Sequence, residues 1–383
     1  MVRSSLLVLT VLSVMLRGLE GQSVPSKPVE EHLRSAINAE ENSDWITAEQ
    51  AYQSALELQP DIPQVYAKLG LVYQFQGKYE QSVEAFQKAL ELYPSLPEGH
   101  FYLGLSYYGL YLYPKAIESL KTAISQNPEN VKAKIYLGVC YLAMGQLNEG
   151  ISGLEKVVQK NPQEVEGLQA LAQAYLSRTR TSYDKFKETF ARLEKLDPNS
   201  FRTHQILAEA YSIQGQLNRA IEEYEKAYAL NPDAPGVNFA LGDLYFGLGQ
   251  YDKAEPALER ELKRDPNHPI VNLELGIIKN YRQEFDQAIQ YLDQVLRVDD
   301  TISDAHVALG MAYVSKGLLV EGIRALKKGV ELEPNRPQAH YQLAQAYKKA
   351  GKIDEAQKEL EVFQKLDTKN RDKRQEVAEK ELQ

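Results

Sequence analysis

The chain has 383 residues, of which 43% are hydrophobic and 25% are charged, and its formal net charge is −9 at pH 7. A length of this order is typical of two or three globular domains. The modest acidic balance disfavours DNA or RNA as the main partner, because nucleic-acid binding usually depends on a basic surface. The single cysteine, Cys140, excludes a disulfide within the chain and a thiolate cluster for zinc or iron–sulfur. Because Cys140 lies in an apolar stretch, we expect it to be a buried packing residue.

The N-terminal segment, residues 1–21, resembles a secretory signal peptide. Arg3 precedes an apolar run over residues 6–16, and small residues follow as far as Gly21. This run is shorter than the roughly 20 residues that a membrane-spanning helix needs. We therefore expect cleavage after Gly21, a linker over 22–28, and a periplasmic or secreted chain without a stable membrane anchor. An uncleaved anchor or a stray apolar leader is the alternative.

Prolines recur through the rest of the chain with a period of 34 residues. They occupy Pro60, Pro94, Pro128, Pro162, Pro198, Pro232, Pro266 and Pro334. One step, from 162 to 198, is 36 residues long, and Asp300 and Thr368 stand at two places of the series where proline is missing. A fixed period of this length is the signature of a repeat architecture.

Two further columns keep the same period. A leucine followed by a small residue recurs in each repeat from the second on, the small residues being Gly70, Gly104, Gly138, Ala172, Ala208, Gly242, Gly276, Gly310 and Ala344. A tyrosine stands three residues later in each of these repeats except one, which has Lys279. This spacing predicts a first helix with these residues on one face. A turn, often with a glycine of positive φ such as Gly77, and a second helix follow, and the small residue leaves room where the two helices cross.

These columns resemble the tetratricopeptide repeat, with its Leu-Gly-x-x-Tyr core, alanines in the second helix and terminal proline. The resemblance implies an all-α, right-handed superhelical solenoid of about ten helix-turn-helix units with a C-terminal capping helix. The predicted units are 29–62, 63–96, 97–130, 131–164, 165–200, 201–234, 235–268, 269–302, 303–336 and 337–370, followed by a polar capping helix or tail over 371–383.

Three departures from the pattern are expected to be local irregularities. The fifth unit has a longer turn around residues 178–182, Pro256 lies inside a predicted second helix, and Lys279 replaces the tyrosine. A functional role for the long turn stays open as an alternative.

No catalytic, cofactor or metal motif is found in the sequence. It contains no HExxH, paired-cysteine, GxSxG or GxxxxGK pattern. Five histidines share one column of the repeat, which we place on the core-facing side: His32, His100, His204, His306 and His340. We therefore predict that they pack in the core, and that the chain is not an enzyme and needs no cofactor or metal.

The resemblance also implies that the first helices line a concave groove that binds a protein or peptide. Columns two, five, nine and twelve of each unit point away from the Leu, Gly and Tyr columns, toward this groove. The candidate partner-binding residues are Phe101, Leu105, Tyr108, Ile135, Val139, Leu142, Phe239, Phe246, Leu273, Ile277, Val307 and Met311. Exposed apolar patches tend to mark partner sites. Packing between neighbouring first helices explains the same residues equally well.

The sequence thus predicts a non-enzymatic interaction scaffold or adaptor, in the cell envelope or secreted, that holds an apolar or amphipathic segment in its groove. A substrate-recognition or regulatory subunit of an enzyme complex is the alternative. An RNA-binding array of helical hairpins is disfavoured by the acidic balance.

Overall fold

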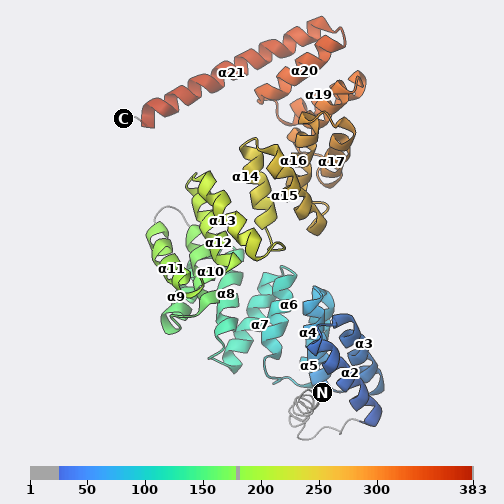
Figure 1. Ribbon diagram of the computed structural model, residues 1–383, viewed down its shortest axis with the longest axis vertical. Helices are drawn as coiled ribbons and strands as arrows, with labels where there is room; N and C mark the ends of the chain where they lie inside the picture. The colour runs from blue at the N-terminus through green and yellow to red at the C-terminus, as the bar shows by residue number, and fades with distance from the viewer. Residues whose placement is uncertain (1–25, 178–181, 382–383) are drawn as a thin grey trace. The chain divides into compact units, whose positions relative to one another are not determined.

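A computed structural model describes residues 26–177 and 182–381, with the side chains of this part given as far as Lys373. The predicted signal peptide, residues 22–25 of the predicted linker, and residues 178–181 of the long turn lie outside this part. Every regular element in the described residues is a helix (Figure 1). The prediction of an all-α repeat fold is confirmed.

The helices form ten hairpins, each with an even-numbered first helix and an odd-numbered second helix. They are α2 (Lys27–Glu41), α3 (Trp45–Leu58), α4 (Pro63–Phe75), α5 (Tyr79–Leu92), α6 (Gly99–Gly109), α7 (Tyr113–Gln126), α8 (Val131–Ala143), α9 (Leu147–Lys160), α10 (Val165–Leu176), α11 (Tyr183–Leu196), α12 (Phe201–Ile213), α13 (Leu217–Leu230), α14 (Val237–Gly247), α15 (Tyr251–Arg264), α16 (Pro269–Tyr281), α17 (Phe285–Val298), α18 (Ser303–Ser315), α19 (Leu319–Leu332), α20 (Pro337–Lys349) and α21 (Ile353–Glu381). α2 begins two residues ahead of the predicted first unit.

The chain divides into two compact units, one ending at Pro198 and the other beginning at Asn199. Within each unit the two helices of a hairpin pack on each other, and the second helix packs on the first helix of the next hairpin. First helices of successive hairpins also touch, for example α6 with α8 in the first unit and α14 with α16 in the second. Each unit therefore has apolar cores of its own.

The small residue of each repeat lies where the two helices of a hairpin cross. A Cβ atom on Gly138 would lie 2.9 Å from Cγ of Leu154, and one on Gly242 would lie 2.5 Å from Cδ2 of Leu258. Contacts this short are closer than side-chain carbons normally approach, so the crossing requires a glycine there. The predicted reason for the small-residue column is confirmed.

Where the structure describes the whole turn between the two helices of a hairpin, that turn contains a residue with positive φ. It is glycine in six hairpins, where φ lies between 70° and 83° at Gly77, Gly145, Gly215, Gly249, Gly317 and Gly351. Ser43, Tyr111 and Gln283 adopt a similar backbone conformation in other turns, with φ between 56° and 63°. Glycine is favoured because it has no Cβ to strain this conformation, as predicted.

Tyrosines of the column join several hairpins to the preceding one. The Tyr245 hydroxyl in α14 donates to Oε1 of Glu225 in α13 at 2.5 Å, and Gln87 in α5 donates to the Tyr107 hydroxyl in α6 at 2.9 Å. In both cases the partner stands 20 residues earlier. The tyrosine ring packs in the core while its hydroxyl bonds the neighbouring second helix.

Lys279, the exception in this column, makes the same kind of connection with a charge. It is 7% exposed, and its Nζ lies 2.5 Å from Oε1 of Glu255 in α15 and 2.8 Å from Oε2 of Glu284. Arg282 also pairs with Glu255. A lysine buried this deeply needs such partners, because an unpaired buried charge is strongly unfavourable.

Two further predictions concern single residues. Cys140 is fully buried, and this burial raises the pKa of its thiol to about 12, so the packing role is confirmed. Pro256 lies inside α15, which continues from Tyr251 to Arg264.

Among the residues that the structure describes, none of the helices combines the length and the apolar character needed to cross a membrane.

Candidate functional site

The histidine column lies at the edge of the core and is only partly buried. His340 is buried, but the other four keep part of their surface accessible to solvent. Nδ1 of His204 lies 2.7 Å from Glu223, and Nδ1 of His340 lies 2.6 Å from Glu359, both acids being in the second helix of the same hairpin. These histidines thus tie hairpin helices together. No group of three His, Cys, Asp or Glu suited to a metal ion occurs in the described residues.

The twelve predicted groove residues lie at three depths. Met311 is the most accessible, at 37% exposed, whereas Phe101, Ile135 and Val307 are buried. The half-buried residues are Leu105, Tyr108, Val139, Leu142, Phe239, Phe246, Leu273 and Ile277. The face of the first helices is therefore apolar but only partly open.

Two of these residues pack within their own hairpins. A Cβ atom on Gly150 of α9 would lie 2.6 Å from Leu142, and one on Gly329 of α19 would lie 2.7 Å from Val307. Both glycines belong to the second helix that faces the predicted residue. For Leu142 and Val307 these contacts are with the second helix of the same hairpin, and packing between neighbouring first helices stays an alternative for the rest of the set.

In the first unit, aromatic side chains form a continuous row across α5 to α8. The ring centroids of Phe101 and Tyr102 are 5.0 Å apart, and those of Tyr108 and Tyr136 are 5.6 Å apart. Contacts of 5.8 to 6.4 Å complete the row. We call this set the aromatic row: Phe86, Phe101, Tyr102, Tyr108, Tyr111, Tyr113 and Tyr136.

The aromatic row runs from the core to the surface. Phe86 is fully buried, whereas Tyr111, in the turn between α6 and α7, is 77% exposed. Sequence reasoning found Phe101 and Tyr108 but missed Tyr102 and Tyr136. Those two residues share the sixth column of consecutive units, and this recurrence was the available signal.

In the second unit the corresponding face combines aromatic and acidic side chains. Phe239, Asp243 and Phe246 stand at positions i, i+4 and i+7 of α14 and so share one side of that helix. The Phe239 ring lies 4.8 Å from that of His268, the residue that caps α16, and the Phe246 ring lies 5.6 Å from that of Tyr251. Asp243 is exposed between the two phenylalanines.

Glu274 of α16 faces Asp243 from the neighbouring first helix. It is 5% exposed and forms a side-chain hydrogen bond with Asp243. Burial, and then the hydrogen bond and charge of Asp243, raise the pKa of Glu274 to about 8, so it holds a proton at pH 7. Its other oxygen, Oε2, is buried without a hydrogen-bond partner. We call these two residues the carboxyl pair. No motif in the sequence singles out this pair.

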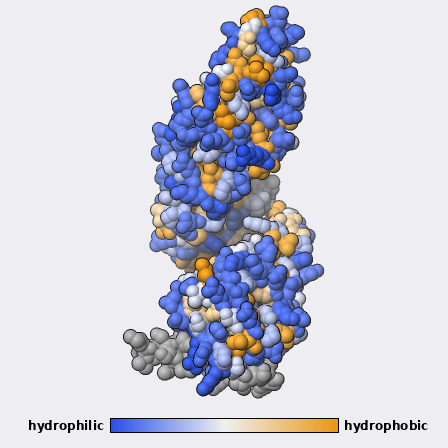
Figure 2. Space-filling view, turned by 90° about the vertical axis from the view of Figure 1, so that its right-hand side faces the viewer, coloured by the Kyte–Doolittle hydropathy of each residue, from blue (hydrophilic) through white to orange (hydrophobic). Residues whose placement is uncertain are grey.

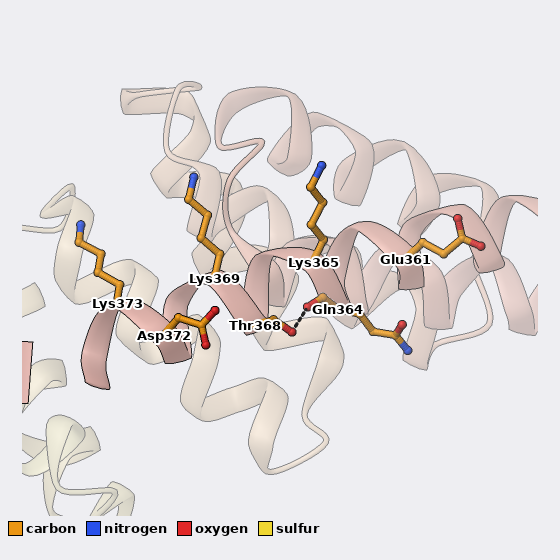
Figure 3. A pocket seen from close by; sticks show the side chains of 7 residues that line it. All are labelled: Glu361, Gln364, Lys365, Thr368, Lys369, Asp372 and Lys373. Atoms are coloured by element: carbon orange, nitrogen blue, oxygen red, sulfur yellow. Dashed lines mark hydrogen bonds between the residues drawn. The ribbon is translucent and has the colours of Figure 1, made fainter. Parts of the chain in front are cut away.

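A surface hollow beside α21 is a weaker candidate. It is lined by residues of α21 itself, with Lys365, Lys369 and Lys373 pointing to the same side in Figure 3. The Thr368 hydroxyl only donates back to the carbonyl oxygen of Gln364, at 2.9 Å. A hollow lined by one helix has no opposing wall that could enclose a ligand.

Comparison with known families identifies the class. A tetratricopeptide repeat family model matches residues 112–174, 212–273 and 317–372. A second model, described as TPR repeat, matches 75–110, and a third, again tetratricopeptide repeat, matches 273–340. Together the matches cover more than half of the chain. The chain belongs to the tetratricopeptide repeat family, whose members are protein-interaction scaffolds. A search among curated proteins finds no match.

Solved structures resemble the chain in fold. A monomeric mutant of IFIT1 with Gppp-AAAA has a TM-score of 0.57 and 17% identity, over 95% of this chain and 86% of that one. Yeast Tom70 has a TM-score of 0.39 and 16% identity over 90% of this chain and 96% of its own. MamA from Desulfovibrio magneticus RS-1 has a TM-score of 0.41 and 20% identity over 44% and 96%. At such identities the likeness to IFIT1 concerns the fold alone.

Proposed function

We propose that the chain is a non-enzymatic adaptor that binds a protein or peptide segment along the first-helix face of its repeats. Membership of the tetratricopeptide repeat family supports a protein partner. The aromatic row is the observation that carries the position of the site. No catalytic step is assigned to any residue of the chain.

The aromatic row has the properties of a partner-binding surface. Tyrosine and phenylalanine bury a large area with few rotatable bonds, and aromatic residues are enriched where protein interfaces bind most strongly. Tyr111 is 77% exposed at the end of the row. Figure 2 shows hydrophobic patches, in orange, among a largely hydrophilic surface. Tyr102, Tyr108, Tyr113 and Tyr136 are half-buried, and a partner can cover their remaining accessible surface together with Tyr111.

Site-specific crosslinking tests this position. A photoreactive phenylalanine analogue replaces Tyr111 or Tyr136, and the matched control carries it at Glu118, an exposed residue of the second helix α7. We expect a crosslinked protein from the two row positions and little from 118. With that partner purified, Tyr108→Ala should weaken its binding tenfold or more, and Glu118→Ala should leave it unchanged. Equal crosslinking from all three positions would contradict the proposed site.

The same partner separates the adaptor from the alternative, a substrate-recognition or regulatory subunit. If the partner is an enzyme whose activity changes when the chain binds, the alternative is correct. A third candidate ligand is RNA, which we test separately because the IFIT1 structure contains Gppp-AAAA. With a net charge of −9, we expect no salt-dependent shift of single-stranded RNA by the purified chain.

We also propose that the chain is exported to the periplasm or secreted. This proposal rests on the apolar run over residues 6–16 and the small residues that follow it. Expression in a bacterial host, cell fractionation and N-terminal sequencing test it. A chain beginning at Gln22 outside the cytoplasm is the expected result, and an intact Met1 in the cytoplasmic fraction would reject it.

A further inference from the structure

We propose that the second unit recognises a basic side chain: the carboxyl pair Asp243 and Glu274, flanked by Phe239 and Phe246, binds the lysine or arginine of an otherwise apolar protein segment. The inference rests on the proposed function, a protein segment held on the first-helix face, and names the chemistry of that segment.

The two helices that carry this site are neighbours. α14 and α16 pack against each other, and the bond between Asp243 and Glu274 connects them. On α16, Leu273 and Ile277 are half-buried and pack against the core formed with α17 and α18, so the apolar neighbours of the carboxyl pair are Phe239 and Phe246 of α14. The surface therefore places one polar point within apolar surroundings, as specific binding sites commonly do.

The carboxyl pair has no cation of its own. In the described part of the chain, neither Asp243 nor Glu274 forms an ion pair with a lysine or arginine. The nearby lysine of α16, Lys279, is already paired with Glu255 and Glu284. Oε2 of Glu274 is buried and unpartnered, which is costly for a polar atom unless a donor reaches it.

Other acidic groups strengthen the negative potential on this face. Tyr224 of α13 is buried, and its pKa is raised first by that burial and then by the charges of Glu209 in α12 and Asp243 in α14. Both acids therefore act on the same buried ring. A cationic ligand is favoured here, and an anionic one is disfavoured.

A lysine or arginine side chain fits each part of the site. An ammonium has three donors and a guanidinium five, so either can bind the exposed carboxylate of Asp243, and its charge then acts on the buried Glu274 that is bonded to Asp243. The alkyl stem of either side chain can lie along Phe239 and Phe246, and the charged end is attracted by the ring faces. An adjacent cation favours the ionised form of Glu274, so binding should release the proton that Glu274 holds.

Peptide selection on the full chain tests the inference. A phage library of random 12-residue peptides is selected on the wild type, on the double variant Asp243→Asn with Glu274→Gln, and on Glu222→Gln. Glu222 is an exposed acid of the second helix α13 and serves as the control for charge. The substitutions keep side-chain shape, and circular dichroism checks that each protein is folded.

We expect wild-type and Glu222→Gln selections to carry a lysine or arginine at one position between apolar residues, and the double variant to lose it. A selected peptide should bind the wild type at least tenfold more tightly than its norleucine-substituted version, and the double variant should bind both equally. Selected peptides without a basic position, or an unchanged preference in the double variant, would overturn the inference while leaving the proposed function standing. If no peptide is enriched above background, both the inference and the proposed function are rejected for the second unit.

Proton release gives a second readout. Binding enthalpies of a selected peptide at pH 7, in two buffers with different ionisation enthalpies, should show release of a proton by the wild type and none by Glu274→Gln. Equal binding enthalpies in the two buffers for the wild type would show that the basic residue of the peptide binds at another acid.

Discussion

Gly138 and Gly153 belong to the same hairpin but have different surroundings. A Cβ atom on Gly138 of α8 would lie 2.9 Å from Leu154. On Gly153 of α9 it would meet no atom within 4 Å, because this glycine borders a surface hollow formed with Leu137 and Tyr141. Only the first glycine is required by packing. The second simply lowers the intrinsic stability of its helix.

This contrast predicts opposite effects on stability. Gly138→Ala should lower the free energy of unfolding by about 1–3 kcal/mol, because an added carbon overpacks the helix crossing. Gly153→Ala should raise it by up to about 1 kcal/mol, the difference in helix propensity. Urea unfolding followed by circular dichroism measures both, and destabilisation of similar size by the two substitutions would refute the assignment of Gly153.

Glu274 predicts a specific dependence of stability on pH. Its pKa rises from the ordinary 4.5 to about 8 on folding, so the folded chain holds this proton more tightly than the unfolded chain does. The resulting stabilisation is complete below pH 4.5 and is lost as the pH rises from 4.5 through about 8. Within this window the free energy of unfolding should fall by up to about 1.4 kcal/mol for each unit of rising pH.

Glu274→Gln isolates this contribution, since glutamine keeps the shape but cannot titrate. Unfolding by urea at several pH values between 4 and 9 should show the variant gaining stability relative to the wild type as the pH rises. The control Glu222→Gln should leave the profile of the wild type unchanged. A constant difference between wild type and Glu274→Gln would show that Glu274 titrates normally.

At the scale of elements, two second helices lack the terminal proline and behave differently. α17 still ends at Val298, and Asp299 accepts hydrogen bonds from the backbone and hydroxyl of Thr301, at 2.9 and 2.6 Å. This local turn competes with further helix. At Thr368 the hydroxyl donates to the Gln364 carbonyl within the helix, and α21 continues to Glu381.

Proline substitutions at residues 300 and 368 should therefore have different effects on helicity. Thr368→Pro removes a helical N–H bond and should release the end of α21, seen as faster proteolysis beyond residue 368 with reduced helicity. Asp300→Pro should be tolerated. The preceding residue, Asp299, has a φ of −147° and a ψ of 106°, and these angles suit a residue before proline. A larger loss of helicity from Asp300→Pro than from Thr368→Pro would contradict this interpretation.

At the scale of the whole molecule, each hairpin depends on its neighbours in the chain. Contacts join hairpin partners and adjacent hairpins within each unit, as in a repeat array where stability is a sum of local and nearest-neighbour terms. A defect should therefore spread over neighbouring hairpins and fade with distance.

Leu292→Ala tests this locality. Leu292 of α17 is fully buried and packs on Gly276 of α16, so its truncation should cost about 2–5 kcal/mol locally. Hydrogen exchange should accelerate in α16 to α18 and stay unchanged in α2 to α5. Uniform acceleration throughout the chain would show a single cooperative structure instead.

The hairpin, its length and its repetition could be predicted from the amino-acid sequence. The small column, the turn glycines such as Gly145 and the tyrosines such as Tyr245 act within one hairpin or between adjacent ones, so a fixed spacing predicts their contacts. Because the same interactions recur, ten weak matches in register identify the fold that one match could not.

The depth at which each side chain of the first-helix face is buried could not be predicted, because it depends on how neighbouring helices pack. Helical periodicity gives a direction but not a depth, so Val307 and Met311 looked alike although one is buried and the other exposed. Likewise no sequence motif marks Glu274. Its burial and its bond to Asp243 depend on the neighbouring helix α14, which lies about one repeat earlier in the sequence and is brought alongside only when the hairpins stack.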